Sequence, residues 1–264
     1  MELHVTLLEI AKKDLEASKH LLSKKLYPQS IFYLEQSVEK AVKSLGVWTK
    51  TITEKEMKEK YISHKAYAVF SHILKKGPGK IWEELKKFDK LFERYPKLYE
   101  WIRNELDEAK EMEEEIQSIP IDKIIDMSYS AEKLQTIINR ININREKVLN
   151  KILRFCLKVG ILVPPLKEDL RSIQKMLLLS TPYFFIPPLF YLSIILYPHA
   201  VKSRYPEKEW NPLEEYNEKM ALIQKLPSII KVLDKAFKSL TQVYKEIPSP
   251  YPSSFTIRIR GETT

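Results

Sequence analysis

The sequence is poor in glycine and contains a single cysteine. Only five glycines occur, and none belongs to a GxGxxG or GxxxxGK[ST] run, so nucleotide binding through a glycine-rich loop is not expected. Cys156 alone excludes an internal disulfide and a cysteine-rich zinc site. It lies in the run ILRFCLKVGIL, where a buried, inert thiol is expected. Charged and apolar residues alternate from Met1 to Leu22, which is not the pattern of a signal peptide, and a cytoplasmic location is therefore expected.

The chain has no long basic run, although its total charge is basic. The 44 Lys and Arg residues exceed the 35 Asp and Glu residues by nine, which permits an anionic partner but does not require one. The basic residues are spread along the chain, and ELDEAKEMEEE, Glu105 to Glu115, is strongly acidic. A solvated, mixed-charge surface is the favoured interpretation. A hydrophobic content of 44% supports a folded core in one or two domains.

One long segment, residues 176–198, has no charged residue. Its length could cross a bilayer. However, it contains four prolines, which would free backbone groups that lipid cannot satisfy: Pro182, Pro187, Pro188 and Pro198. The segment is therefore expected to pack inside the protein or at a subunit contact, and no membrane span is predicted.

Apolar residues recur at helical spacing along most of the chain, which predicts an all-α protein. The first two helices, from Val5 to Lys24 and then up to Leu45, should form an antiparallel hairpin, with Gly46 as a C-terminal cap. A third helix is expected from Ser63, its N-cap, to Lys75. Further helices are predicted at 80–117 with a break at Tyr95-Pro96, 121–143, 146–160, 168–179 and 213–244, the last with a kink at Pro227.

The polar residues of YLEQSVEKAVKSLG, in the second helix, also follow a helical pattern. Glu35 and Glu39 share one stripe of the helix, and Gln36 and Lys40 share another. Each pair could bond a neighbouring helix or subunit, or could belong to a solvated face.

Four pieces of the chain resemble the HEPN domain, a helical-bundle family named for nucleotide binding in higher eukaryotes and prokaryotes. They are KKDLEASKHLLSKKLYPQSIFYLEQSVEKAVKSLG (12–46), SHKAYAVFSHIL, SRYPE and the long helix after NPLEEY. The resemblance implies an antiparallel bundle formed by residues 1–78 and 186–246. Residues 79–185 look like a helical insertion, and residues 247–264 are expected to be a flexible tail.

The resemblance implies two kinds of function. Many HEPN proteins are metal-independent ribonucleases that use an Arg followed four to six residues later by a His, whereas others bind a nucleotide, RNA or a partner nucleotidyltransferase. None of the five histidines here has an arginine at that spacing. We therefore favour a non-catalytic binding protein, a homodimer with no cofactor and no metal. The alternatives are a divergent ribonuclease using His199 and Arg204, or a membrane-associated structural protein.

The predicted ligand site centres on Arg204 and Tyr205, in the piece similar to the family's Arg-Tyr-Pro. A guanidinium can hold a phosphate bidentately, and a tyrosine ring can stack on a base. His64 and Lys65, opening the third helix, would add donors near a helix N-terminus, which favours anions. The alternative is a structural salt bridge from Arg204 to Glu35 or Glu39.

Overall fold

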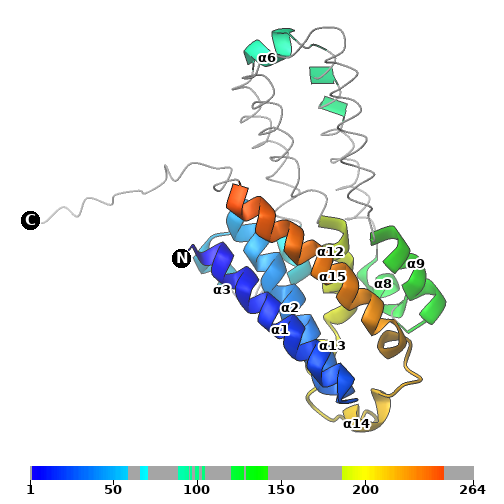
Figure 1. The fold of residues 1–264 in the computed structure, drawn as a ribbon. Helices are drawn as coiled ribbons and strands as arrows, with labels where there is room; N and C mark the ends of the chain where they lie inside the picture. The colour runs from blue at the N-terminus through cyan, green and yellow to red at the C-terminus, as the bar shows by residue number, and fades with distance from the viewer. Residues whose placement is uncertain are drawn as a thin grey trace, which may run out of the picture.

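The computed structural model is an all-α bundle, as the sequence predicts (Figure 1). The structure describes residues 2–58, 66–70, 89–94, 96, 99–100, 103–104, 120–127, 129–141 and 186–246. The helices with assigned bounds in these ranges are α1 (Leu3–Ser23), α2 (Tyr27–Trp48), α3 (Glu54–Lys58), α6 (Asp89–Arg94), α8 (Ile121–Met127), α9 (Ala131–Ile141), α12 (Ile186–Leu196), α13 (His199–Lys202), α14 (Pro212–Glu215) and α15 (Ala221–Glu246). Residues 66–70 are also helical.

The predicted hairpin of α1 and α2 is held by a repeated contact between serines and main-chain carbonyls. Ser37 Oγ donates to Ala11 O at 2.7 Å, and one heptad on, Ser44 Oγ donates to His4 O at the same distance. One heptad back, Ser18 and Ser30 each donate a hydroxyl to the other's carbonyl. Because serine is small, the two helices approach closely, and every buried hydroxyl in this row has an acceptor.

Helix α2 lies at the centre of the bundle. It packs against α1, α12, α13, α14 and α15, and Figure 1 shows it behind α1 and α15. Its apolar side chains are almost fully buried: Ile31, Leu34, Val38, Ala41, Val42, Leu45 and Trp48. Neighbouring helices cover several sides of α2. Polar side chains that would face water on a surface helix therefore contact other parts of the protein here.

The uncharged segment enters the core where the structure describes it. From Leu189 to Leu196 nearly every side chain of α12 is buried, against α2, α8 and α9. Packing inside the bundle, one of the two predicted locations, is thus observed for this part, and residues 176–185 lie outside the described ranges. None of the described helices combines the length and the apolar composition needed to cross a membrane.

Gly46 is not the C-terminal cap that the sequence pattern predicts. Helix α2 continues to Trp48, and Thr49 is its C-cap. A Cβ on Gly46 would lie 2.7 Å from Val69 Cγ1 and 2.9 Å from Ile52 Cδ1. Glycine at this helical position therefore allows the side chains of Val69 and Ile52 to pack closely against α2.

Two predicted helices are divided. Instead of a helix from 121 to 143, α8 and α9 are separated around Ser130, whose carbonyl and hydroxyl accept from the first turn of α9. Instead of a helix from 213 to 244, α14 is followed by a turn in which the Asn217 side chain accepts from Lys219 N at 2.8 Å. Side-chain acceptors at these two points offer the backbone an alternative to the helix. Helix α15 then runs through Pro227.

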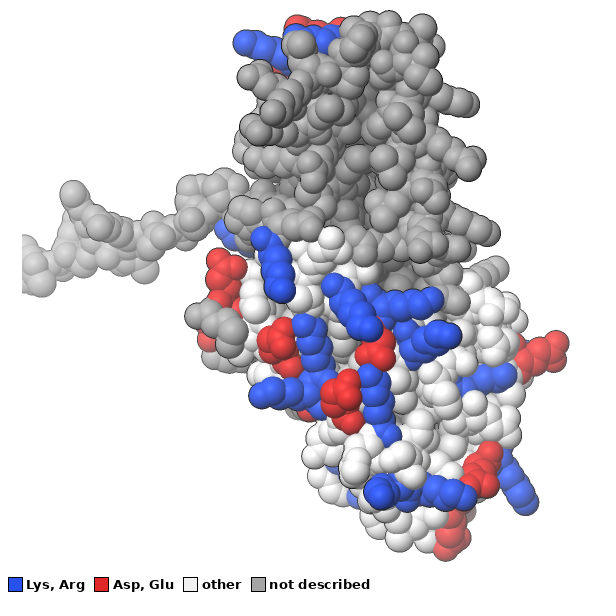
Figure 2. All heavy atoms as spheres, in the orientation of Figure 1, with Lys and Arg blue, Asp and Glu red and all other residues white. Residues whose placement is uncertain are grey.

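The face formed by α1 and α15 carries basic side chains with acidic ones among them (Figure 2). Lys12 pairs with Glu9 on α1, and Lys19 pairs both with Glu16 and with Asp234 of α15 at 2.8 Å. The Lys19–Asp234 pair ties the two helices together.

Candidate functional site

Arg204 follows α13, and a main-chain carbonyl of that helix anchors its side chain. Its Nε donates to Ala200 O at 2.7 Å. That bond uses the Nε–H group of the guanidinium. No residue in the described ranges accepts a hydrogen bond from the two terminal nitrogens. These nitrogens are the pair that can hold a phosphate or carboxylate bidentately.

Two aromatic rings flank the Arg204 guanidinium. Its carbon lies 4.8 Å from the centre of the Phe32 ring and 5.1 Å from the centre of the Tyr205 ring, both within the range of a cation–π contact. Tyr205 is 56% exposed, and Tyr33, edge-on to Phe32, is 37% exposed. A guanidinium with two unused terminal nitrogens therefore stands beside exposed aromatic surface, formed by the start of α2 and the residues after α13. We call Phe32, Arg204 and Tyr205 the arginine–aromatic cluster.

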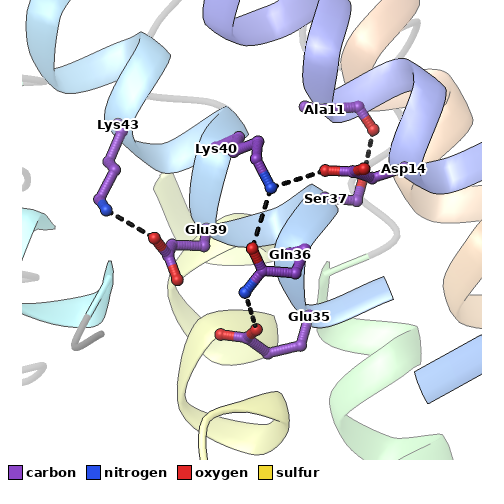
Figure 3. A network of polar contacts seen from close by, with 8 residues as sticks. All are labelled: Ala11, Asp14, Glu35, Gln36, Ser37, Glu39, Lys40 and Lys43. Carbon is purple, nitrogen blue, oxygen red and sulfur yellow. Dashed lines mark hydrogen bonds and ion pairs between the residues drawn. The ribbon is translucent and has the colours of Figure 1, made fainter. Parts of the chain in front are cut away.

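The polar stripes of α2 form a chain of contacts, shown in Figure 3. Lys40 Nζ donates to Asp14 Oδ2 of α1 at 2.7 Å and to Gln36 Oε1 at 3.0 Å. Gln36 Nε2 in turn donates to Glu35 Oε2 at 2.9 Å. One of the two predicted stripes thus bonds a neighbouring helix, as one of the two interpretations expected.

Glu35 is a buried carboxyl group beside a second one. Burial, followed by the charge of Glu39, raises the pKa of Glu35 to about 7, against opposing contributions from Gln36, Lys40 and Arg204. Glu39 itself is paired with Lys43 one turn along. Glu35 can therefore change its charge near neutral pH, close to the arginine–aromatic cluster.

The predicted structural alternative for Arg204 is not observed as an ion pair. Within the described part of the chain, Arg204 forms no ion pair with Glu35 or Glu39, and Glu39 is paired with Lys43. The guanidinium is near enough to Glu35 to lower its pKa, so the interaction between them is a longer-range one.

His199 faces the interior and does not share a surface with Arg204. Its ring is fully buried, and Nδ1 lies 2.6 Å from the Tyr216 hydroxyl. Burial, with a smaller contribution from Lys202, lowers the pKa of His199 to about 3. Its Nε2 is buried and has no hydrogen-bond partner in the described structure. In this arrangement the imidazole is neutral and cannot reach a ribose hydroxyl, so the proposed pairing of His199 with Arg204 in catalysis has no geometric support.

Two predicted site residues, His64 and Lys65, lie outside the described residues. Phe32 was missed by the sequence analysis, although it stands three residues before Glu35 and so projects from the same side of α2. The pattern at the start of α2 shows three aromatic residues, Tyr27, Phe32 and Tyr33, but only the return of the chain after α13 distinguishes Phe32.

Elsewhere, a hollow of about 550 Å³ lies between the turn of the hairpin and the turn before α15. Its Lys25 is engaged by Glu218 at 2.8 Å, and the Tyr27 hydroxyl donates to the same carboxylate. Two of the three charged residues that line the hollow, Lys25 and Glu218, are therefore paired with each other. Among the described residues, no group of three or more His, Cys, Asp or Glu side chains is placed to hold a metal ion.

In a comparison with protein families, residues 5–124 match the HEPN domain. No curated protein matches the chain. No solved structure matches it either. The match begins with the hairpin that carries the sequence resemblance and confirms it, and it extends through residues 79–124, for which the division into bundle and insertion stays a prediction. The helical bundle and the family match agree, and residues 5–124 carry a HEPN domain.

Proposed function

We propose that this protein is a non-catalytic HEPN protein that binds a nucleotide or RNA at the arginine–aromatic cluster. The observation that supports this most is the pair of free terminal nitrogens on Arg204 next to the exposed Tyr205 ring. A phosphate and a base lie next to each other in every nucleotide, and this cluster offers one group for each.

The physical case rests on preorganisation. The Nε bond to Ala200 and the contact with Phe32 hold the guanidinium before any ligand arrives. A flexible surface arginine would lose side-chain entropy on binding, whereas an anchored one loses less. The partly exposed aromatic face adds stacking, which is tolerant of base identity. We therefore expect binding without strong sequence preference.

The test is a comparison of Arg204→Ala and Arg204→Lys in the full chain. Loss of the charge-assisted bonds should weaken the binding of a uridine or adenosine mononucleotide by about 1.5–3 kcal/mol, with little change in melting temperature. Lysine keeps the charge but not the bidentate geometry, so it should recover only part of the affinity. If Arg204→Ala instead lowers the melting temperature and leaves binding unchanged, Arg204 is a structural residue and the site is wrong.

Binding measurements with a mononucleotide and with an RNA oligonucleotide distinguish the two possible ligands, a nucleotide and RNA. Binding of both, each weakened by Arg204→Ala, indicates that one nucleotide is enough for recognition. Binding of the oligonucleotide alone indicates RNA.

The homodimer and the partner nucleotidyltransferase remain proposals that only the family resemblance supports. In the described residues the apolar side chains of α12 are turned inward, so these side chains are not available to a homodimer contact. Sedimentation at micromolar concentration tests it, and a strict monomer contradicts it.

A further inference from the structure

Helix α15 carries four lysines on its solvent side. Their positions follow the spacings i, i+4, i+7 and i+14, which places them within about 80° of one another around the helix and along about 21 Å of its length. All four are exposed, whereas the opposite side of α15 packs into the core. We call these residues the lysine row: Lys231, Lys235, Lys238 and Lys245.

The lysine row is not neutralised by the protein. No ion pair or hydrogen bond from any of its four ammonium groups is present in the described structure. By contrast Lys12, Lys19, Lys40 and Lys43 of the hairpin each pair with a carboxylate. The one acidic residue within the span of the row, Asp234, is taken by Lys19.

This arrangement costs stability. Like charges one turn apart on a helix repel by a few tenths of a kcal/mol, and Lys231 and Lys235 stand in that relation. Figure 2 shows basic side chains, with acidic ones among them, on the face formed by α1 and α15. A row of one sign whose members are unpaired is complementary to a chain of negative charges.

We infer that the lysine row binds the sugar–phosphate backbone of single-stranded RNA. This deepens the proposed function and rests on it, since the row would add contacts to the phosphates of a bound RNA. A span of about 21 Å is long enough to face several consecutive phosphates of one strand. Lysine suits this task because its ammonium acts as a point charge that does not read sequence.

The alternative polyanion is a membrane surface. A helix that binds in a membrane interface presents large apolar side chains beside its basic ones. In the described part of the chain, the large apolar side chains that are exposed come from other segments: Ile10, Leu26, Tyr33, Ile121, Tyr129, Val201, Tyr205 and Leu213. With none of them on α15, the row has nothing to insert into lipid, and RNA is favoured.

The test uses a fluorescently labelled uridine oligonucleotide long enough to span the row, bound to the full chain over a range of salt concentrations. The fourfold variant replaces each lysine of the row by glutamine. Since each neutralised phosphate of a single strand contributes about 0.7 to the slope of log K against log salt, the variant should lower that slope by about two to three.

A second fourfold variant is the matched control, with the same change in net charge at exposed lysines away from the row: Lys24, Lys55, Lys133 and Lys208, each changed to Gln. It should keep the wild-type slope. Equal loss in both variants would show only an effect of total charge and would overturn the inference. So would a row variant that keeps its RNA slope but no longer binds vesicles containing phosphatidylserine, because that outcome assigns the row to a membrane.

The proposals for the lysine row and for the arginine–aromatic cluster can be disproved independently of each other. Mononucleotide binding reports on Arg204 and should be unchanged in the row variant. If no mononucleotide binds but the salt slope still depends on the row, the backbone contact stands and the proposed nucleotide site does not.

Discussion

Arg204 and Phe32 are 172 positions apart in the sequence, yet the guanidinium carbon of one lies 4.8 Å from the ring centre of the other. The contact joins the segment after α13 to the first turns of α2, and it holds the arginine with its terminal nitrogens unused. The contact between these two residues is the basis of the proposed site.

Replacing the exposed ring should weaken binding without affecting the fold. Tyr205 is 56% exposed, so Tyr205→Ala removes a stacking surface and little packing. We expect nucleotide affinity to fall by about 1–3 kcal/mol per stacked base, with Tyr205→Phe close to wild type because the ring remains. Isothermal titration of both variants measures this. Equal loss in both would point to the hydroxyl and contradict a stacking role.

Glu35 should make the protein more stable in mild acid than in base. Its folded pKa of about 7 lies above the ordinary value of 4.5, so the folded state holds a proton that the unfolded state releases. The associated stability is fully present below about pH 4.5 and is lost as the pH rises through about 7. Glu35→Gln should remove this decline and should stabilise the protein above pH 7 by up to about 3 kcal/mol.

Denaturant unfolding of wild type and Glu35→Gln across this pH range checks the sign. A matched control is Glu16→Gln, at an exposed site on α1, which should leave the pH dependence in place. If the stability of wild type and of Glu35→Gln both increased steadily with pH through neutral pH, the assignment of Glu35 would be contradicted.

His199 should have the opposite effect on acidification. Its folded pKa of about 3 lies below the ordinary 6.5, so the unfolded state binds the proton more readily. The stability contributed by the neutral imidazole is present above about pH 6.5 and is lost as the pH falls towards 3. His199→Gln should reduce this acid sensitivity even if it lowers stability at neutral pH. An imidazole that NMR shows to titrate near 6.5 would disprove the burial on which this depends.

Gly46→Ala should destabilise the bundle. The added Cβ meets Val69 and Ile52 at less than van der Waals distance, and overpacking of this kind costs about 1–3 kcal/mol. Ordinarily Gly to Ala inside a helix is stabilising by about 1 kcal/mol, so the sign of the change distinguishes the two effects. Adding Val69→Ala to Gly46→Ala should recover part of the loss. A higher melting temperature for Gly46→Ala alone would show that the contact can relax.

The elements that the sequence predicts well are those that depend on local pattern. The hairpin, the all-α class and the inward packing of α12 follow from the period of apolar residues and from prolines that lipid would not tolerate. The turn between α1 and α2 follows from Pro28, which suits the first turn of a helix. A further local signal was overlooked: Thr53 and Glu56 form a capping box that begins α3.

Features that depend on a distant partner could not be predicted in the same way. Gly46 has the sequence context of a cap, and only the approach of Val69 shows why a glycine is required inside the helix. The buried state of Glu35 depends on α2 being central, which the amphipathic pattern of α2 alone does not reveal. Phe32 becomes part of a site only because the chain returns to it after α13.

Photo-crosslinking tests the proposed site most directly. The full chain is irradiated with an RNA oligonucleotide carrying 4-thiouridine, and the crosslinked peptides are identified by mass spectrometry. The account predicts crosslinks in the peptides that contain Phe32 and Tyr205, reduced in Arg204→Ala and competed by mononucleotide. Crosslinks that fall elsewhere and are unchanged in Arg204→Ala would contradict it.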